Sequence, residues 1–196
     1  MTRFSSSMAL ALLFALASPS HALDAGKTLD ASGVKGGLVV HLHCGDGKAT
    51  AALCANDATI VHGLSTDAQA VAAARIAAGQ RHGRVSFDVF DGRNLPYLDN
   101  LVNLVAADAL GDVPLSEVLR VLAPGGVAVI GGRKTVKPWP RDIDEWTHFL
   151  HDASGNAVAQ DTRVATPRGV QWVCGPQRSR HHDALASMSA MTSSGG

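Results

Sequence analysis

The sequence predicts an α/β fold with a doubly wound, mostly parallel sheet of about five strands, followed by an irregular C-terminal extension. Two observations support this class. Short apolar runs of strand length alternate with alanine-rich stretches of helix length, as in parallel βαβ units. The first strand also leads directly into a glycine-containing turn and then a helix, which is the arrangement at the ligand-binding edge of such sheets.

The first strand and its turn, at residues 38–48, are the best-defined part of this pattern. The run from Leu38 to Leu42 is apolar enough to be buried on both faces, as a central parallel strand is. Gly45 and Gly47 would permit a tight turn and bring backbone N–H groups close to a ligand at the start of a helix. We therefore expect the ligand site at this turn.

The other elements are predicted from periodicity and capping. Ser65 to Asp67 offers N-cap side chains for the helix that Gly79 closes, and Pro124 to Gly126 is expected to form a turn. Right-handed crossovers would then place the ligand beyond the carboxyl ends of the strands. Helices are predicted at 23–33 (capped near Asp30), 48–56, 68–78 and 114–122, and further strands at 59–64, 85–89, 101–106 and 127–130.

The N-terminal residues 1–22 have the pattern of a secretory signal peptide. Arg3 precedes a short apolar run, and Ser20-His21-Ala22 provides small residues for cleavage after Ala22. The apolar run is too short to span a bilayer comfortably, so we expect no membrane span after cleavage; an uncleaved anchor is the alternative. The mature protein is thus expected to be exported, periplasmic or extracellular.

Composition and the cysteine count exclude some classes. Lysine plus arginine equals aspartate plus glutamate, 17 each, so the formal net charge is zero and no nucleic acid partner is indicated. Cys44, Cys54 and Cys174 form an odd set with one member inside the glycine turn, which predicts free thiols rather than a disulfide framework.

Residue 132 is the predicted end of the folded domain, which gives a signal peptide at 1–22, a domain at 23–132 and an irregular linker at 133–196. Two prolines and several cations lie in 133–141, and the remainder is polar without a sustained period. The chain ends on Ser-Ser-Gly-Gly without a capping element, which suggests a lead-in to a further domain, whereas an unstructured terminus is the alternative.

Histidines near the turn raise the possibility of a metal site. His41 and His43 lie two apart on a predicted strand and would point the same way, with Cys44 beside them, and imidazole and thiolate suit zinc or copper. His148 and His151 would lie on one face of a helical turn. No spacing completes a ligand set, so hydrogen-bonded rings are the preferred interpretation and no metal site is assigned.

Four segments in order, 39–47, 62–75, 91–105 and 117–127, resemble class I S-adenosylmethionine-dependent methyltransferases. The most specific are Leu95-Pro96-Tyr97-Leu98-Asp99-Asn100 before an apolar strand and Val118-Leu119-Arg120-Val121-Leu122-Ala123-Pro124-Gly125-Gly126. The resemblance spans residues 36–131 and implies a Rossmann-like fold with S-adenosylmethionine as the cofactor. It assigns no catalytic residue, since methyl transfer depends mainly on positioning. The implied cofactor-binding positions are His41, His43, Gly45, Asp46, Gly47, Ser65, Asp67, Asp91 and Gly92.

Three of these positions depart from the family pattern. His41 and Ser65 stand where the family has acidic residues, and His43 stands where it has the first glycine of the turn. A lost carboxylate bond in a buried site costs about 1.5–3 kcal/mol, and a ring at His43 would obstruct the cofactor. We therefore expect a methyltransferase-like domain with weak or no activity.

The C-terminal part resembles the lead-in of large exported bacterial proteins in which a methyltransferase-like domain precedes a β-propeller of the type that binds pyrroloquinoline quinone. The segments 144–152, 156–159, 171–173 and 180–183 support this. The resemblance implies a C-terminal β-propeller as partner and suggests, as alternatives, a non-catalytic module of such a protein or a metal- or redox-binding exported domain.

Overall fold

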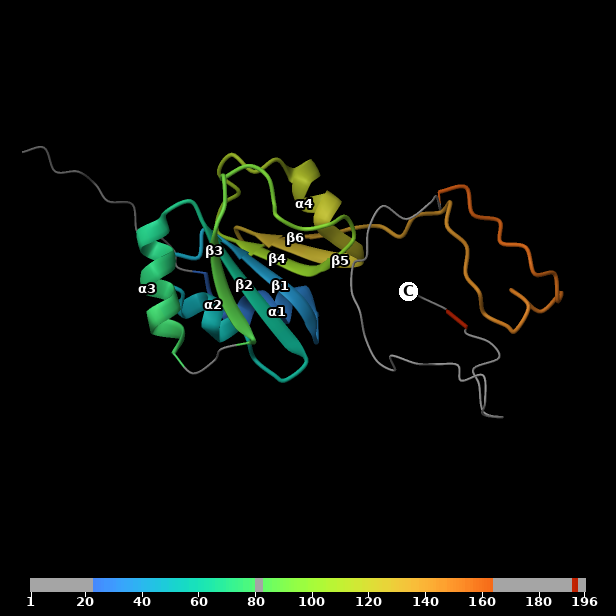
Figure 1. The fold of residues 1–196 in the computed structure, drawn as a ribbon, viewed down its shortest axis with the longest axis horizontal. Helices are drawn as coiled ribbons and strands as arrows, with labels where there is room; N and C mark the ends of the chain where they lie inside the picture. Colours follow the sequence, from blue (N-terminus) through green and yellow to red (C-terminus); the bar gives the residue numbers. More distant parts are fainter. Residues whose placement is uncertain (1–22, 80–82, 164–191, 194–196) are drawn as a thin grey trace, which may run out of the picture.

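The computed structural model describes residues 23–79, 83–163 and 192–193, so the predicted signal peptide lies outside the described residues. One six-stranded sheet has the order β3-β2-β1-β4-β5-β6 (Figure 1). Strands β1 to β5 are parallel and β6 runs antiparallel to β5, which confirms the predicted doubly wound class. The elements are α1 (Ala25–Ser32), β1 (Gly37–Leu42), α2 (Lys48–Leu53), β2 (Thr59–Ser65), α3 (Ala68–Ala78), β3 (Val85–Val89), β4 (Val102–Ala107), α4 (Leu115–Val121), β5 (Leu122–Ile130) and β6 (Arg133–Val136).

The strand order reverses between β1 and β4, which lie side by side at the centre of the sheet with Val39 opposite Leu104 and His41 opposite Ala106. In doubly wound sheets, ligands bind outside the carboxyl ends of the strands at this point of reversal. The turn after β1 therefore lies at the expected ligand edge.

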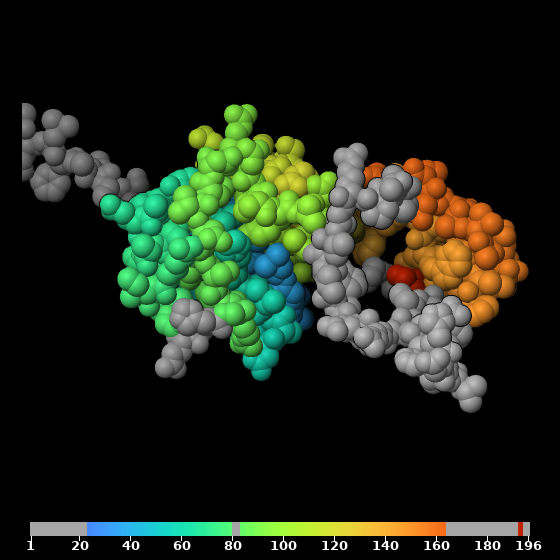
Figure 2. Space-filling model, in the orientation of Figure 1, coloured from blue at the N-terminus to red at the C-terminus, as the bar shows by residue number. Residues whose placement is uncertain are grey.

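One face of the sheet is covered by α1, α2 and α3, and the other by α4 and the loop of residues 91–101 (Figure 1). Figure 2 shows the green residues of this loop close to the yellow residues of α4. The two faces bury separate apolar clusters because alternate strand residues point to opposite sides. Val39, Val61 and Leu104 contribute to the cluster under the three helices, and Val40, Leu64 and Val105 to the other.

Helix α1 begins at an N-cap that the sequence analysis misplaced. The Asp24 carboxylate, not that of Asp30, accepts the backbone N–H of Lys27, and the helix ends at Gly33 in the left-handed conformation. Asp30 lies inside the helix. For α3, the N-cap at Asp67 and the C-cap at Gly79 agree with the prediction.

Strand β6 was not predicted, and the sheet continues beyond residue 132 to Val136. Gly131 and Gly132 form the tight turn between β5 and β6, both with positive φ angles. Pro124 to Gly126 lies within β5 rather than in a separate turn, and a register shift between Val102 and Leu104 of β4 accommodates it. Leu122 pairs with Val102 before this shift, and Val127 pairs with Leu104 after it.

Residues 137–163 contain neither a helix nor a strand. His148 and His151 form an antiparallel bridge with each other rather than a helical turn, so the prediction of one shared helical face is wrong. His151 is buried, with its Nε2 2.7 Å from Asp144 Oδ2 and its ring against Trp146. In the part of the chain that the structure describes, no helix has the length and apolar character needed to cross a membrane.

Candidate cofactor site

The turn after β1 has the predicted order of strand, turn and helix start, with Gly47 as the N-cap of α2. Gly45 and Gly47 both have positive φ angles, and a Cβ at Gly45 would meet open space. A Cβ at Gly47, by contrast, would lie 2.8 Å from both Ala74 Cβ and Phe87 Cζ. Gly47 is therefore required by packing of the turn against α3 and β3, a reason that the sequence did not reveal.

His43 lies after the end of β1, in the turn itself, with φ +56°. Its Nε2 is 3.3 Å from the carbonyl oxygen of Leu110, in the loop after β4, and its ring centroid is 5.9 Å from that of Phe90, after β3. The imidazole thus connects the turn to two other loops at the carboxyl edge. A left-handed backbone is typical of glycine at such a position and is uncommon for other residues.

His41 lies inside β1 and is buried, so the expectation that it points the same way as His43 from one strand is wrong. Its Nδ1 is 2.7 Å from Thr50 Oγ1 of α2. Burial, with a smaller contribution from His43, lowers the pKa of His41 to about 4. The side chain is therefore neutral at pH 7 where the resemblance implies a carboxylate.

Ser65 and Asp67 are used locally at the start of α3. The Ser65 hydroxyl accepts the backbone N–H of Asp67 at 3.1 Å, and one carboxylate oxygen of Asp67 accepts that of Gln69 at 2.8 Å. Ser65 is buried. Asp67 therefore acts as a helix cap and does not take the place of the family carboxylate at Ser65.

Asp46 and Asp91 are also engaged by near neighbours. The Asp46 carboxylate accepts the Lys48 backbone N–H and pairs with its ammonium group at 2.8 Å. Asp91 accepts two backbone N–H groups and the Asn94 side-chain amide, and these hydrogen bonds lower its pKa. A Cβ at Gly92 would lie 2.9 Å from Thr66 Cγ2, so the loops after β2 and β3 are in contact.

The carboxyl edge thus brings His43, Phe90 and Leu110 together, whereas the carboxylates at 46, 67 and 91 are each engaged by their own loops. A ligand with an ammonium group or a ribose diol would meet a neutral His41 and an engaged Ser65 in place of two free carboxylates. Charge-assisted hydrogen bonds are about twice as strong as neutral ones, so this edge is poorly equipped for such a ligand.

Sequence reasoning missed the partners of the two histidines, Thr50, Phe90 and Leu110. Thr50 follows the turn as the third residue of α2, and a polar residue there is the only signal that a buried histidine had a partner. Phe90 stands just before Asp91, but nothing in its spacing indicated contact with His43.

A further polar network, on the sheet face that α4 covers, was also not predicted from the sequence. His62 lies with Nε2 3.1 Å from Asp88 Oδ2 and Nδ1 2.7 Å from the Tyr97 hydroxyl. Burial lowers the pKa of His62 more than Asp88 raises it, and burial raises that of Tyr97. These contacts connect the 91–101 loop to β2 and β3.

Within residues 23–79, 83–163 and 192–193, no group of three histidine, cysteine or acidic side chains is placed to hold a metal ion. Cys44 and Cys54 are buried free thiols, and burial raises the pKa of Cys44 to about 11. Cys174, Trp172, His181 and His182 lie outside the described residues.

Comparison with known families gives a match in the same region. Residues 39–126 match the model of a family described as a methyltransferase domain. The match begins in β1 and ends in β5, so it spans the turn and all the predicted site positions. No curated protein matches the chain.

Several solved structures are similar to the sheet domain. The [4+2]-cyclase SpnF is 27% identical, with a TM-score of 0.49 over 54% of this chain and 42% of that one. A protein from Methanococcus maripaludis, described as an S-adenosylmethionine-dependent methyltransferase, is 21% identical, with a TM-score of 0.48 over 54% of this chain and 52% of that one. Geranyl diphosphate C-methyltransferase from Streptomyces coelicolor, solved with S-adenosylhomocysteine, is 23% identical, with a TM-score of 0.49 over 54% of this chain and 43% of that one. The chain spans about half the length of these proteins.

Proposed function

We propose that residues 37–136 form a methyltransferase-like domain that binds S-adenosylmethionine weakly and transfers methyl groups slowly or not at all. The family match over residues 39–126 and the strand order support the cofactor and the reaction class. The altered carboxyl edge supports the loss of affinity. Methyl transfer relies on holding an acceptor and the sulfonium carbon in line, so weak binding alone is sufficient to reduce activity.

The observation that carries this proposal is the position of His43. Its ring extends from the turn toward Phe90 and the Leu110 carbonyl, over the place where the resemblance puts the cofactor. A cofactor bound there would have to displace the ring and break its hydrogen bond. It would then lack the two carboxylates that His41 and Ser65 replace.

Titration calorimetry of the protein with S-adenosylhomocysteine tests the proposal directly. We expect wild type to bind with a dissociation constant of about 1 mM or weaker, and His43→Gly with Ser65→Asp to bind at least about tenfold more tightly per substitution. His148→Gly, an exposed histidine far along the chain, is the matched control and should change nothing. Micromolar binding by wild type would contradict the proposal.

A second candidate is a non-catalytic module that leads into an exported β-propeller. It is favoured by the pairing of Trp146 with Ser193, whose backbone groups form two antiparallel hydrogen bonds across a long separation in sequence. The pairing brings residue 193 back to the segment 144–152, to which the resemblance with such proteins extends. Propeller repeats encoded in the same reading frame would support it, and an unrelated or absent domain there would argue against it.

Export is part of the same proposal. Expressed in a bacterial host, the protein should be recovered outside the cytoplasm, and N-terminal sequencing should read from Leu23. A protein that retains Met1 and stays in the cytoplasm would contradict this. A metal- or redox-binding role is the least supported alternative, and metal analysis of the purified protein tests it.

A further inference from the structure

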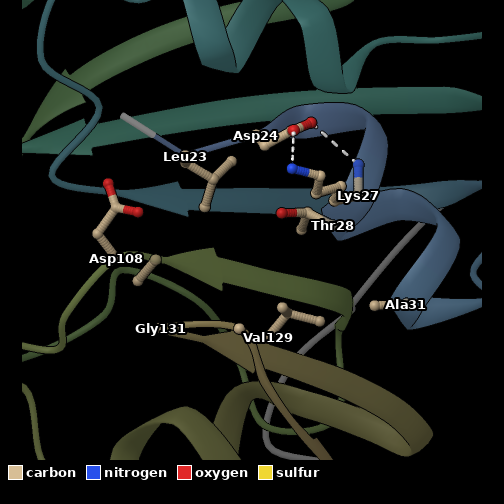
Figure 3. Close-up of a pocket in the computed structure, with 10 residues that line it drawn as sticks. Leu23, Asp24, Lys27, Thr28, Ala31, Asp108, Val129 and Gly131 are labelled. Atoms are coloured by element: carbon tan, nitrogen blue, oxygen red, sulfur yellow. Dashed lines mark hydrogen bonds and ion pairs between the residues drawn. The ribbon is translucent and has the colours of Figure 1, made fainter. Parts of the chain in front are cut away.

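The polar network at His62 connects elements that lie far apart in the chain. At the half-open hollow in Figure 3, between α1 and the ends of β4 and β5, the Asp24 carboxylate pairs only locally, with Lys27 in the first turn of α1 at 3.2 Å. His62 instead joins β2 to β3 and to the loop of residues 91–101. A histidine that joins elements in this way can make their contact depend on pH.

The partners of His62 determine where the protons of this network lie. The Asp88 carboxylate pairs with Arg75 at 2.6 Å and can only accept a hydrogen bond. Nε2 of His62, 3.1 Å from Asp88 Oδ2, therefore carries the proton of the neutral imidazole. Nδ1 is then without a proton and accepts a hydrogen bond from the Tyr97 hydroxyl at 2.7 Å. The neutral ring thus holds Tyr97 on the sheet, with the phenol as donor.

Protonation of His62 removes the acceptor at Nδ1. Both ring nitrogens then carry hydrogens, so the Tyr97 hydroxyl must turn, and its own hydrogen loses its partner. Among residues 23–79, 83–163 and 192–193, His62 is the only side chain that hydrogen-bonds this hydroxyl. Tyr97 is partly buried against an apolar cluster, where a hydroxyl hydrogen without an acceptor is costly. The protonated ring therefore disfavours the docked position of Tyr97.

The groups that face His62 decide the direction of the effect. Asp88 from β3 favours the protonated ring, Arg75 from α3 opposes it, and the residues paired with His62 on β1 and β3 carry no charge. Only 16% of the side chain is exposed, and this burial outweighs Asp88, so the pKa of His62 lies below the ordinary 6.5. An undocked Tyr97 exposes the imidazole, which then takes up its proton at a higher pH. A falling pH therefore favours the undocked state.

A second anchor of the same loop does not titrate in this range. Arg120 donates to the carbonyl oxygens of Leu95 and Tyr97, and a guanidinium group stays charged in proteins. Arg120 holds the backbone of the loop, whereas His62 holds the ring of Tyr97. Loss of the contact with His62 therefore frees the ring without detaching the loop.

We propose that His62 is a pH-dependent latch: the neutral imidazole holds the Tyr97 ring on the sheet, and the protonated imidazole releases it. Release uncovers part of the apolar cluster against which the ring packs. The latch does not involve S-adenosylmethionine, so its test is independent of the function proposed above.

Tyr97 is the only tyrosine in the chain, so selective ¹³C labelling of tyrosine gives NMR signals from this ring alone. The full chain is compared at about pH 7.5 and about pH 5 by the relaxation that a neutral gadolinium chelate adds to these signals. We expect at least about twofold more relaxation enhancement at the lower pH, because the released ring is open to solvent. The midpoint of the change should lie below pH 6.5.

His62→Gln should abolish this pH dependence, because an amide does not titrate. Asp88→Asn should move the midpoint to a lower pH, because it removes the carboxylate that favours the protonated ring. His148→Gln is the matched control, since it replaces an exposed histidine outside the network, and it should keep the wild-type midpoint.

Circular dichroism at both pH values checks that each variant is folded, and Asp88→Asn decides the matter if His62→Gln is not. Enhancement in wild type that stays constant or falls at the lower pH would overturn the proposal. So would a change that persists in folded His62→Gln, or a midpoint in Asp88→Asn that is the same as in wild type or higher.

Discussion

The two faces of the sheet are covered in different ways. Under α1, α2 and α3, the cover is regular helix, with apolar residues such as Leu53, Val71 and Ala74 turned to the strands. On the opposite face, α4 is only seven residues long, and residues 91–101 cover the strands beside it without forming a helix. That irregular cover is held by polar side chains.

Arg120 of α4 is the centre of this attachment. Its guanidinium donates to the carbonyl oxygens of Leu95 and Tyr97 and pairs with Glu117 and Asp99. Glu117 in turn accepts the Leu95 backbone N–H at 2.8 Å. The comparison teaches that helices cover a sheet mainly through apolar residues at helical spacing, even where Arg75 of α3 also donates to the Phe87 carbonyl oxygen, whereas the irregular loop depends on several polar anchors.

Gly47→Ala should have the largest effect, on the helix-covered face. The new Cβ would clash with Ala74 and the Phe87 ring and would force a left-handed backbone on alanine. We expect a loss of about 3–4 kcal/mol in the free energy of unfolding, measured by urea denaturation.

Gly45→Ala is the matched control for this substitution. It imposes a similar positive φ on alanine, but its Cβ meets no atom within 4 Å. We expect a loss of only about 1 kcal/mol from the backbone strain. Equal losses for the two variants would show that packing of the turn against α3 is not what requires Gly47.

His41→Gln tests the buried pair of His41 and Thr50, on the same face of the sheet, through the pH dependence of the free energy of unfolding. The folded-state pKa of about 4 lies below the ordinary value of 6.5, so the unfolded chain takes up the proton first as pH falls. The resulting stability is present above pH 6.5 and is lost toward pH 4, by about 3 kcal/mol. The variant should lack this part of the pH dependence, while His148→Gln retains it. An identical profile for His41→Gln would contradict burial of a neutral imidazole.

Arg120→Met tests the loop-covered face and should have a smaller effect than Gly47→Ala or His41→Gln. Removing the guanidinium leaves two carbonyl groups and the Glu117 carboxylate without their partner, at about 2 kcal/mol. Hydrogen exchange at the Leu95 amide should accelerate more than exchange in β4. Arg93→Met, from an exposed arginine of the same loop, is the control. Unchanged exchange at Leu95 in Arg120→Met would show that the loop is held by apolar contacts instead.

Much of the fold followed from local pattern. Helix α3 and strand β3 have the predicted bounds, because capping residues and apolar alternation mark both ends of each. Strand β6 escaped detection because Arg133, Lys134 and Thr135 give it no apolar pattern. It is a strand because it pairs with β5 across the turn at Gly131 and Gly132.

The position of residues 41–47 at the carboxyl edge of the sheet was predictable, but their contacts were not. The order of strand, turn and helix placed residues 41–47 at the carboxyl edge, and local hydrogen bonding of Asp67 as a cap was evident from its position before α3. The partners of His43 and His41 come from other elements, and no spacing in one sequence reports such long-range contacts.

The sequence by itself determined the α/β class, the order of the first five strands along the chain and the turn at which a ligand site was expected, because these depend on local periodicity and backbone preference. Only the tertiary structure decided that His43 reaches the loop after β4, that Gly47 is required for packing against α3 and β3, and that His41 meets Thr50 of α2. Those features depend on where residues distant in the chain meet, which burial and strand pairing decide together.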